Sequence, residues 1–399
     1  MHELFILECM IIRQNLKSQH LINKIIKMNF WNFLLYSGRL FLFRYSINSL
    51  FIFLLCTLLF SCKGKSPFSG YKPVAIGKPN QVDIVMDSSL RQSEVWDSID
   101  YFFGSAYPVM PAPEPFFDLR HLTLKDVEYD PYKKELKTLI FVVDLSDTSS
   151  QVTKMFKKDA GEEKWNKALQ DMDFTYLVAK DKWAKGQMLV YLFANGKTSL
   201  ASSIRKNFPA VAARINKNDG EALKASLYGS KGKNQELSEL VKNKYGLSVD
   251  IPPYFVKALD EENFLWLRLD DKKAIHNFVF RKFPYKNEAQ FSKENLIKIR
   301  DEYGKQYIKT SSADAYMRTN PVDLPVYEYE FGANGIYGKE FRGIWETVND
   351  FMGGPFFSYL LLNKNANEVI FIDAFVLAPG EDKRNMMQKL DYVIKNVSF

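Results

Sequence analysis

The sequence predicts an α+β protein of two subdomains: a mixed α/β N-terminal half, then an antiparallel sheet covered by helices on one face. Between residues 79 and 247, apolar strand patterns alternate with amphipathic helices, which is typical of mixed α/β layers. From residue 248 to 399, strand patterns follow one another across Asp, Glu and Asn turns. The chain ends in a helical pattern, with Met386, Leu390 and Val393 on one face.

In the N-terminal half, short apolar runs predict strands at residues 82–86, 139–145 and 188–194. A proline-dense loop at residues 108–115 excludes regular helix and central strand. Residues 198–245 predict a run of helices with charged faces that ends at Tyr245-Gly246.

In the C-terminal half, a meander and a later group of strands flank one helix. The meander is expected at residues 254–258, 264–269 and 274–280. The helix covers residues 292–308, with Ser292 as its cap. The later strands are expected at residues 341–346, 355–362 and 369–377. Gly353-Gly354 is expected to supply a backbone conformation that only glycine adopts readily.

An apolar run from Leu50 to Cys62, with Arg39 and Arg44 before it, indicates an export signal. Its core is shorter than the roughly 20 residues that a membrane-spanning helix needs. Leu59-Phe60-Ser61-Cys62 resembles the lipobox of bacterial lipoproteins, which implies that the sulfur of Cys62 carries the lipid. An uncleaved signal anchor and an ordinary cleaved signal are the alternatives.

The distance of Cys62 from the first residue predicts a later start, because signal peptides run to about 30 residues. We expect Met28 to be the true start, so that residues 1–27 are an artefact of gene assignment and residues 28–62 are the signal peptide. Residues 63–78, rich in glycine and proline, would tether the subdomains 79–247 and 248–399 to the membrane. No acidic run follows Cys62, which favours an outer-membrane protein that faces the periplasm.

Composition excludes several classes of site. The chain holds 54 basic and 47 acidic residues, of which 48 basic and 45 acidic residues lie after residue 61. These charges nearly cancel and are dispersed along the sequence, so we expect no nucleic-acid partner. Only Cys62 remains of three cysteines, and only His121 and His276 of four histidines. We therefore expect no disulfide, metal site or cofactor.

Several motifs carry a resemblance over residues 77–399. These are Gly77-Lys-Pro-Asn80, Phe341-Arg-Gly-Ile-Trp345, Met352-Gly-Gly-Pro-Phe356 and Ala378-Pro-Gly380 with Lys383-Arg384. Together they resemble a family of Bacteroidetes-type lipoproteins known only as a domain of unknown function. The order of elements in the second half is also weakly similar to the PsbP-like and DcrB-like folds. Those folds imply a binding or assembly module, by analogy alone.

The candidate binding residues are Arg342, Trp345, Asp373, Lys383 and Arg384. Asp373 lies inside an apolar strand, where a carboxylate needs a partner, and Arg342 is the partner we expect. Lys383 and Arg384 flank a strand-to-helix junction and could hold an anionic headgroup. These residues favour a non-catalytic envelope module that binds a protein or lipid. The alternative is a periplasmic enzyme that uses carboxylate and arginine chemistry.

Replacing Cys62 with serine should release the protein from the membrane, because each buried methylene of an acyl chain contributes about 0.8 kcal/mol to anchoring. Cell fractionation and labelling with a palmitate analogue would measure this. Cys56→Ser, inside the apolar run, is the matched control and should stay anchored and labelled. A Cys62→Ser protein that remains wholly in the membrane fraction would show that the anchor lies elsewhere.

Overall fold

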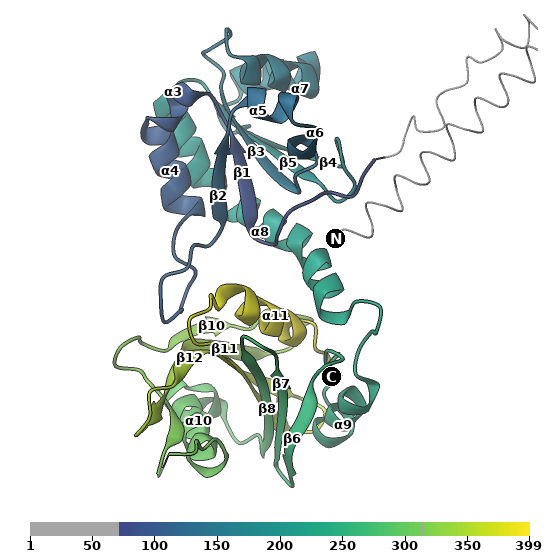
Figure 1. Ribbon diagram of the computed structural model, residues 1–399, viewed down its shortest axis with the longest axis vertical. Helices are drawn as coiled ribbons and strands as arrows, with labels where there is room; N and C mark the ends of the chain where they lie inside the picture. Colours follow the sequence, from purple (N-terminus) through teal and green to yellow (C-terminus); the bar gives the residue numbers. More distant parts are fainter. Residues whose placement is uncertain (1–71, 313) are drawn as a thin grey trace, which may run out of the picture. The chain divides into compact units, whose positions relative to one another are not determined.

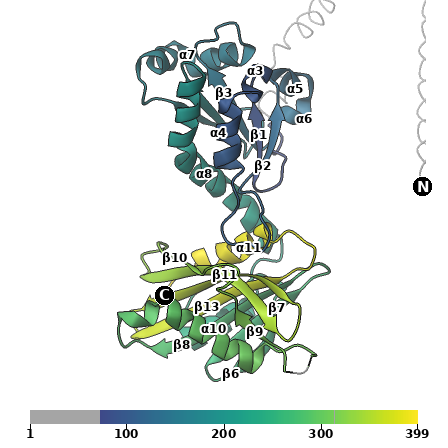
Figure 2. The ribbon, with the colours of Figure 1, turned by 90° about the vertical axis from the view of Figure 1, so that its left-hand side faces the viewer.

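The computed structural model describes residues 72–312 and 314–399, which contain two β-sheets (Figures 1 and 2). The predicted signal peptide, Cys62 and the tether up to residue 71 lie outside the described residues. Within the described ranges, no helix combines the length and the apolar character that crossing a membrane requires. The predicted α+β class, with mixed α/β and antiparallel halves, is confirmed.

The first sheet has five strands, of which four are parallel and β4 at one edge is antiparallel. In spatial order these are β2 (Asp118–Leu122), β1 (Gln81–Val85), β3 (Thr138–Asp144), β5 (Met188–Ala194) and β4 (Tyr176–Lys180). The central strands β3 and β5 are buried almost throughout, which explains their continuous apolar runs. The edge strands β2 and β4 are half-exposed, and the apolar pattern does not predict them.

Helices cover both faces of this sheet (Figure 1). One face packs against α3 (Ser88–Arg91), α4 (Glu94–Phe103) and the long α8 (Lys197–Tyr228). The other packs against α5 (Leu124–Tyr129) and α7 (Gln151–Gln170), with the short α6 (Pro131–Lys134) following α5. Helix α9 (Gln235–Tyr245) ends where the sequence predicts, because Gly246 takes the left-handed conformation with φ 65°.

The second sheet is antiparallel, and its main path runs β10-β11-β12-β13-β8-β7-β6. The strands are β6 (Val256–Glu261), β7 (Phe264–Asp270), β8 (Ile275–Pro284), β10 (Tyr327–Glu330), β11 (Gly338–Val348), β12 (Gly353–Asn363) and β13 (Glu368–Leu377). A short strand, β9 (Tyr316–Thr319), also pairs with β11. The remaining elements are the 3-10 turn η1 (Glu288–Phe291), α10 (Lys293–Tyr307) and α11 (Arg384–Lys395).

Helices lie on both faces of the second sheet, so the prediction of a single covered face is wrong. Along β12, Phe357 and Tyr359 enter one core together with α9 and α11, whereas Phe356 and Leu360 enter the other with α10. Because the central strands are apolar on both faces, each face needs a cover. Helix α9, placed by the sequence in the first subdomain, packs into the core of this second sheet.

Gly353 and Gly354 allow neighbouring backbones to approach closely. They do not adopt an unusual backbone dihedral angle, so our expectation is wrong. Neither residue has a positive φ. A Cβ added to Gly354 would stand 2.1 Å from the carbonyl oxygen of Val376 on the next strand. A side chain at this position would therefore force β12 and β13 apart.

We predict that the protein loses stability in mild acid because of His276 on β8. Its side chain is 9% exposed, and burial lowers its pKa; Asp271 opposes this effect and Lys389 adds to it. The unfolded chain therefore binds the proton first, and stability falls as the pH drops below about 6.5, by at most about 1.4 kcal/mol per pH unit. Urea unfolding at pH 7.5 and pH 5 should show a smaller acid loss for His276→Gln than for wild type. Equal acid losses in the two proteins would contradict the prediction.

Candidate functional site

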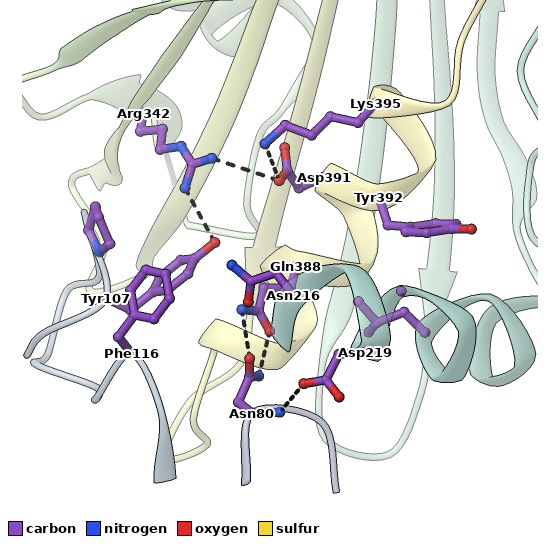
Figure 3. A pocket seen from close by; sticks show the side chains of 13 residues that line it. Asn80, Tyr107, Phe116, Asn216, Asp219, Arg342, Gln388, Asp391, Tyr392 and Lys395 are labelled. Atoms are coloured by element: carbon purple, nitrogen blue, oxygen red, sulfur yellow. Dashed lines mark hydrogen bonds and ion pairs between the residues drawn. The ribbon is translucent and has the colours of Figure 1, made fainter. Parts of the chain in front are cut away.

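A cleft of about 330 Å³ lies where α8, α11 and β11 meet the segments around Asn80 and Tyr107 (Figure 3). Its lining combines aromatic, amide and charged side chains. These are Asn80, Tyr107, Pro108, Phe116, Asn216, Asp219, Gly220, Leu223, Arg342, Gln388, Asp391, Tyr392 and Lys395. We call this site the cleft.

Two helix faces with the same residue spacing supply most of this lining. Helix α8 contributes residues 216, 219, 220 and 223, and α11 contributes residues 388, 391, 392 and 395. Both sets follow the i, i+3, i+4, i+7 pattern that places side chains on one stripe of a helix. On α11 the neighbouring stripe, with Met387, Leu390 and Ile394, is buried in the core of the second sheet. Packing of that apolar stripe therefore turns the polar stripe toward α8.

Arg342 is the centre of the charged wall of the cleft. Its Nε and Nη2 donate to Glu340, and Nη2 lies 3.7 Å from the carboxylate of Asp391 (Figure 3). Its Nη1 donates to the hydroxyl of Tyr107 at 3.3 Å, and the guanidinium carbon lies 4.1 Å from the ring centre of Phe357. Only 11% of the Arg342 side chain is exposed, so these partners replace most of its hydration.

Lys395 and Tyr359 complete the group of charges around Asp391. The ammonium of Lys395 lies 2.8 Å from Asp391 and 3.6 Å from Glu340, and the buried hydroxyl of Tyr359 also donates to Asp391. Two cations thus face two carboxylates. We call Glu340, Arg342, Asp391 and Lys395 the charge quartet.

The charge quartet fixes the protonation of its own cations. Burial lowers the pKa of Arg342, but Tyr107, Asp391 and Glu340 outweigh this effect and leave the pKa raised. The pKa of Lys395 is raised in the same way, by Asp391 and Glu340 against burial. Burial is also the main reason that the pKa of the Tyr107 hydroxyl is raised. Both cations therefore stay charged at neutral pH, and Tyr107 keeps its proton.

The opposite wall is held by a network of amides around Asn80. Its backbone N–H donates to Asp219 at 2.8 Å, and Asp219 pairs with Lys137 at 2.5 Å. The side-chain amide of Asn80 donates to Gln388 at 2.6 Å (Figure 3). It also donates to Asn385 at 2.7 Å. These bonds link the start of β1 to α8 and α11.

Of the five predicted binding residues, only Arg342 lines the cleft. Trp345 is 4% exposed and lies in the α10-side core of the second sheet. The expected pairing of Asp373 with Arg342 is wrong. Asp373 is fully buried and pairs instead with Arg300 of α10, at 3.0 and 2.9 Å, and accepts further bonds from Tyr303 and Ser358.

Lys383 and Arg384 take part in a junction between the subdomains. The backbone N–H groups of Lys383 and Arg384 donate to the two carboxylate oxygens of Glu114, at 2.7 and 2.8 Å. The side chain of Arg384 is 5% exposed, and its guanidinium pairs with Asp118 at 2.7 Å. Arg384 is thus satisfied by the protein's own acids.

Sequence reasoning missed Asp391 and Arg300, although a signal was present. Arg300 occupies the buried stripe of α10 together with Leu296, Ile299 and Tyr303. Asp391 likewise follows Met387 and Leu390 on α11. A charged residue at an apolar position of a helix predicts a buried partner. Within the described residues, no group of three or more histidine, cysteine or acidic side chains could hold a metal ion.

Two family models match the chain, one in each half. Residues 234–396 match a family described as "Domain of unknown function (DUF4837)", and residues 75–228 match "Domain of unknown function (DUF8532)". The chain thus resembles families known only as domains of unknown function, as the motifs predict. No curated protein matches the chain.

Among solved structures, the matches include a mutant of the protein Mog1 and the Saccharomyces cerevisiae Ran-binding protein Mog1p. The first has 10% identity and a TM-score of 0.27, and covers 39% of this chain and 92% of that one. The second has 8% identity and a TM-score of 0.26, and covers 39% and 91%. At these TM-scores the likeness carries no argument about function.

Arg300→Met should destabilise the protein by about 3–5 kcal/mol, because it leaves the buried carboxylate of Asp373 without its cation. Urea unfolding would measure the loss. The double variant Arg300→Met/Asp373→Leu should recover much of it, since no unpaired charge remains. Arg318→Met removes an exposed pair with Glu346 and is the control, with an expected cost below about 1 kcal/mol. An equally small cost for Arg300→Met would refute a stabilising role for the buried pair.

Proposed function

We propose that this protein is a cell-envelope lipoprotein that binds another envelope component in the cleft without catalysing a reaction. Cys62 would hold it to the outer membrane, with residues 72–399 in the periplasm. The lipobox-like sequence before Cys62 supports the anchor, and the glycine- and proline-rich segment after it supports a tethered domain.

The observation that carries the binding role is the composition of the cleft. It is concave, it lies where the two subdomains meet, and it combines aromatic surface with a few convergent polar groups. Ligand sites in proteins favour this location and this mixture. A volume of about 330 Å³ suits a small molecule or a short projecting segment of a larger one.

The state of the charges favours binding over catalysis. A general base must be free to take a proton, and its pKa should lie near the working pH. The raised pKa values of Arg342 and Lys395 keep both protonated, and Asp391 already accepts bonds from Tyr359 and Lys395. The charge quartet is therefore suited to orient a bound molecule, whereas the enzyme alternative needs one of these groups to be released.

Gly220 offers a way to block the cleft without removing a charge. It lies on α8 in the lining, and a Cβ built there would meet only Tyr392, at 3.8 Å. We expect Gly220→Phe to fold and to fill the cleft with its ring. Full-length protein extracted from membranes of producing cells and studied by native mass spectrometry should then have lost a bound component that wild type retains.

Ala225→Phe is the matched control, because residue 225 is exposed on the same helix and does not line the cleft. It should retain the component, and the melting temperatures of the three proteins should agree closely. A component that binds Gly220→Phe as well as wild type, or wild-type protein that carries none, would refute binding in the cleft.

A further inference from the structure

We infer that the ligand of the cleft is an uncharged saccharide of one or two rings. This inference rests on the proposed function, since it names the chemical class that the same site would take. Three properties of the lining carry it: its charge balance, its hydrogen-bonding groups and its apolar surfaces.

The charges of the cleft cancel. In the charge quartet, Arg342 and Lys395 are matched by Glu340 and Asp391, and Asp219 on the opposite wall is matched by Lys137. An entering anion would meet Asp391 and Asp219, whereas an entering cation would meet Arg342 and Lys395. Either would disturb an existing pair at low dielectric, so the cleft favours a ligand without charge.

The polar groups suit hydroxyls, which both donate and accept. Asn216 presents an amide with a donor and an acceptor side, and Gln388, whose amide is paired with the buried Asn80, has one further hydrogen and one further lone pair. The hydroxyl of Tyr107 accepts from Arg342 and keeps its own proton to donate. Lys395 is 42% exposed at the rim, so its ammonium can donate outward as well as to Asp391. A phosphate would use only the donors of this set.

The apolar groups suit the C–H face of a sugar ring. Tyr107 and Phe116 lie with ring centres 5.6 Å apart on one side of the cleft, and Leu223 and Tyr392 belong to its helical walls (Figure 3). Aromatic rings combine flat apolar area with a polar edge, and a sugar presents the complementary combination. The cleft volume of about 330 Å³ limits the ligand to a small number of rings.

Matched pairs of disaccharides test the charge rule. Full-length protein in a sugar-free detergent would be titrated with N,N′-diacetylchitobiose and its cationic twin chitobiose, and with cellobiose and its anionic twin cellobiouronic acid, by saturation-transfer NMR. We expect at least one neutral disaccharide to bind, at least about tenfold more tightly than its charged twin. Gly220→Phe should abolish this binding, and Ala225→Phe should preserve it.

Lys395→Met gives a second, independent test. It removes one cation at the rim and leaves the carboxylates in excess, so chitobiose should bind this variant more tightly than it binds wild type. Hexa-N-acetylchitohexaose distinguishes the source of the sugar: binding indicates the end of a polysaccharide, and its exclusion indicates a free disaccharide.

The saccharide inference is overturned if no neutral probe binds, if a charged twin binds as tightly as its neutral partner, or if Gly220→Phe binds the probe as wild type does. These failures are separable from failure of the proposed function. A component that Gly220→Phe loses in native mass spectrometry, but whose mass is not that of a saccharide, would leave the cleft as the binding site and exclude only the ligand class.

Discussion

The carboxylate of Glu114 fixes the helix on which the cleft depends. Its two oxygens accept the first free N–H groups of α11, those of Lys383 and Arg384, although Glu114 lies about 270 residues earlier in the chain. An acid at a helix N-terminus satisfies donors that have no partner within the helix and complements the helix dipole. Because Glu114 belongs to the loop before β2, the first subdomain determines where α11 of the second begins. The polar stripe of α11 is thereby held in place beside α8.

Arg384 strengthens this junction with its side chain. Its guanidinium donates to Asp118 at the start of β2 and to the carbonyl of Pro115, so in both sets of contacts the second subdomain supplies the donors and the first supplies the acceptors. Glu381, which lies just before α11 in the chain, pairs with Lys273. The contacts of Lys383 and Arg384 within the protein thus explain why these two residues occur at the strand-to-helix junction. Through these contacts the junction holds the two subdomains together.

Local patterns predicted the elements that are buried and periodic, and failed for contacts between distant residues. The apolar runs of β3, β5 and β13 could be predicted because these strands are buried along almost their whole length, and α11 because its buried residues repeat at the helical spacing. Strand β2 is half-exposed and carries no such pattern. Asp373 could be recognised as a buried acid in need of a partner. The identity of that partner depended on α10 covering the second face of the sheet, which the sequence pattern did not show.

The two buried arginines, Arg300 and Arg342, differ in how far their networks of partners extend toward solvent. Arg300 and Asp373 are fully buried and paired at hydrogen-bond distance, and such pairs can often be replaced by apolar residues without loss of stability. Arg342 has the same kind of carboxylate partners but lies at the edge of a cleft, and Lys395 extends its network to solvent. Retaining four charges beside an open, largely apolar cavity carries a desolvation cost that packing alone does not require. The proposed recognition of a polar, uncharged molecule would account for that arrangement, because neutral but strongly polar walls orient hydroxyl groups and disfavour ions of either sign.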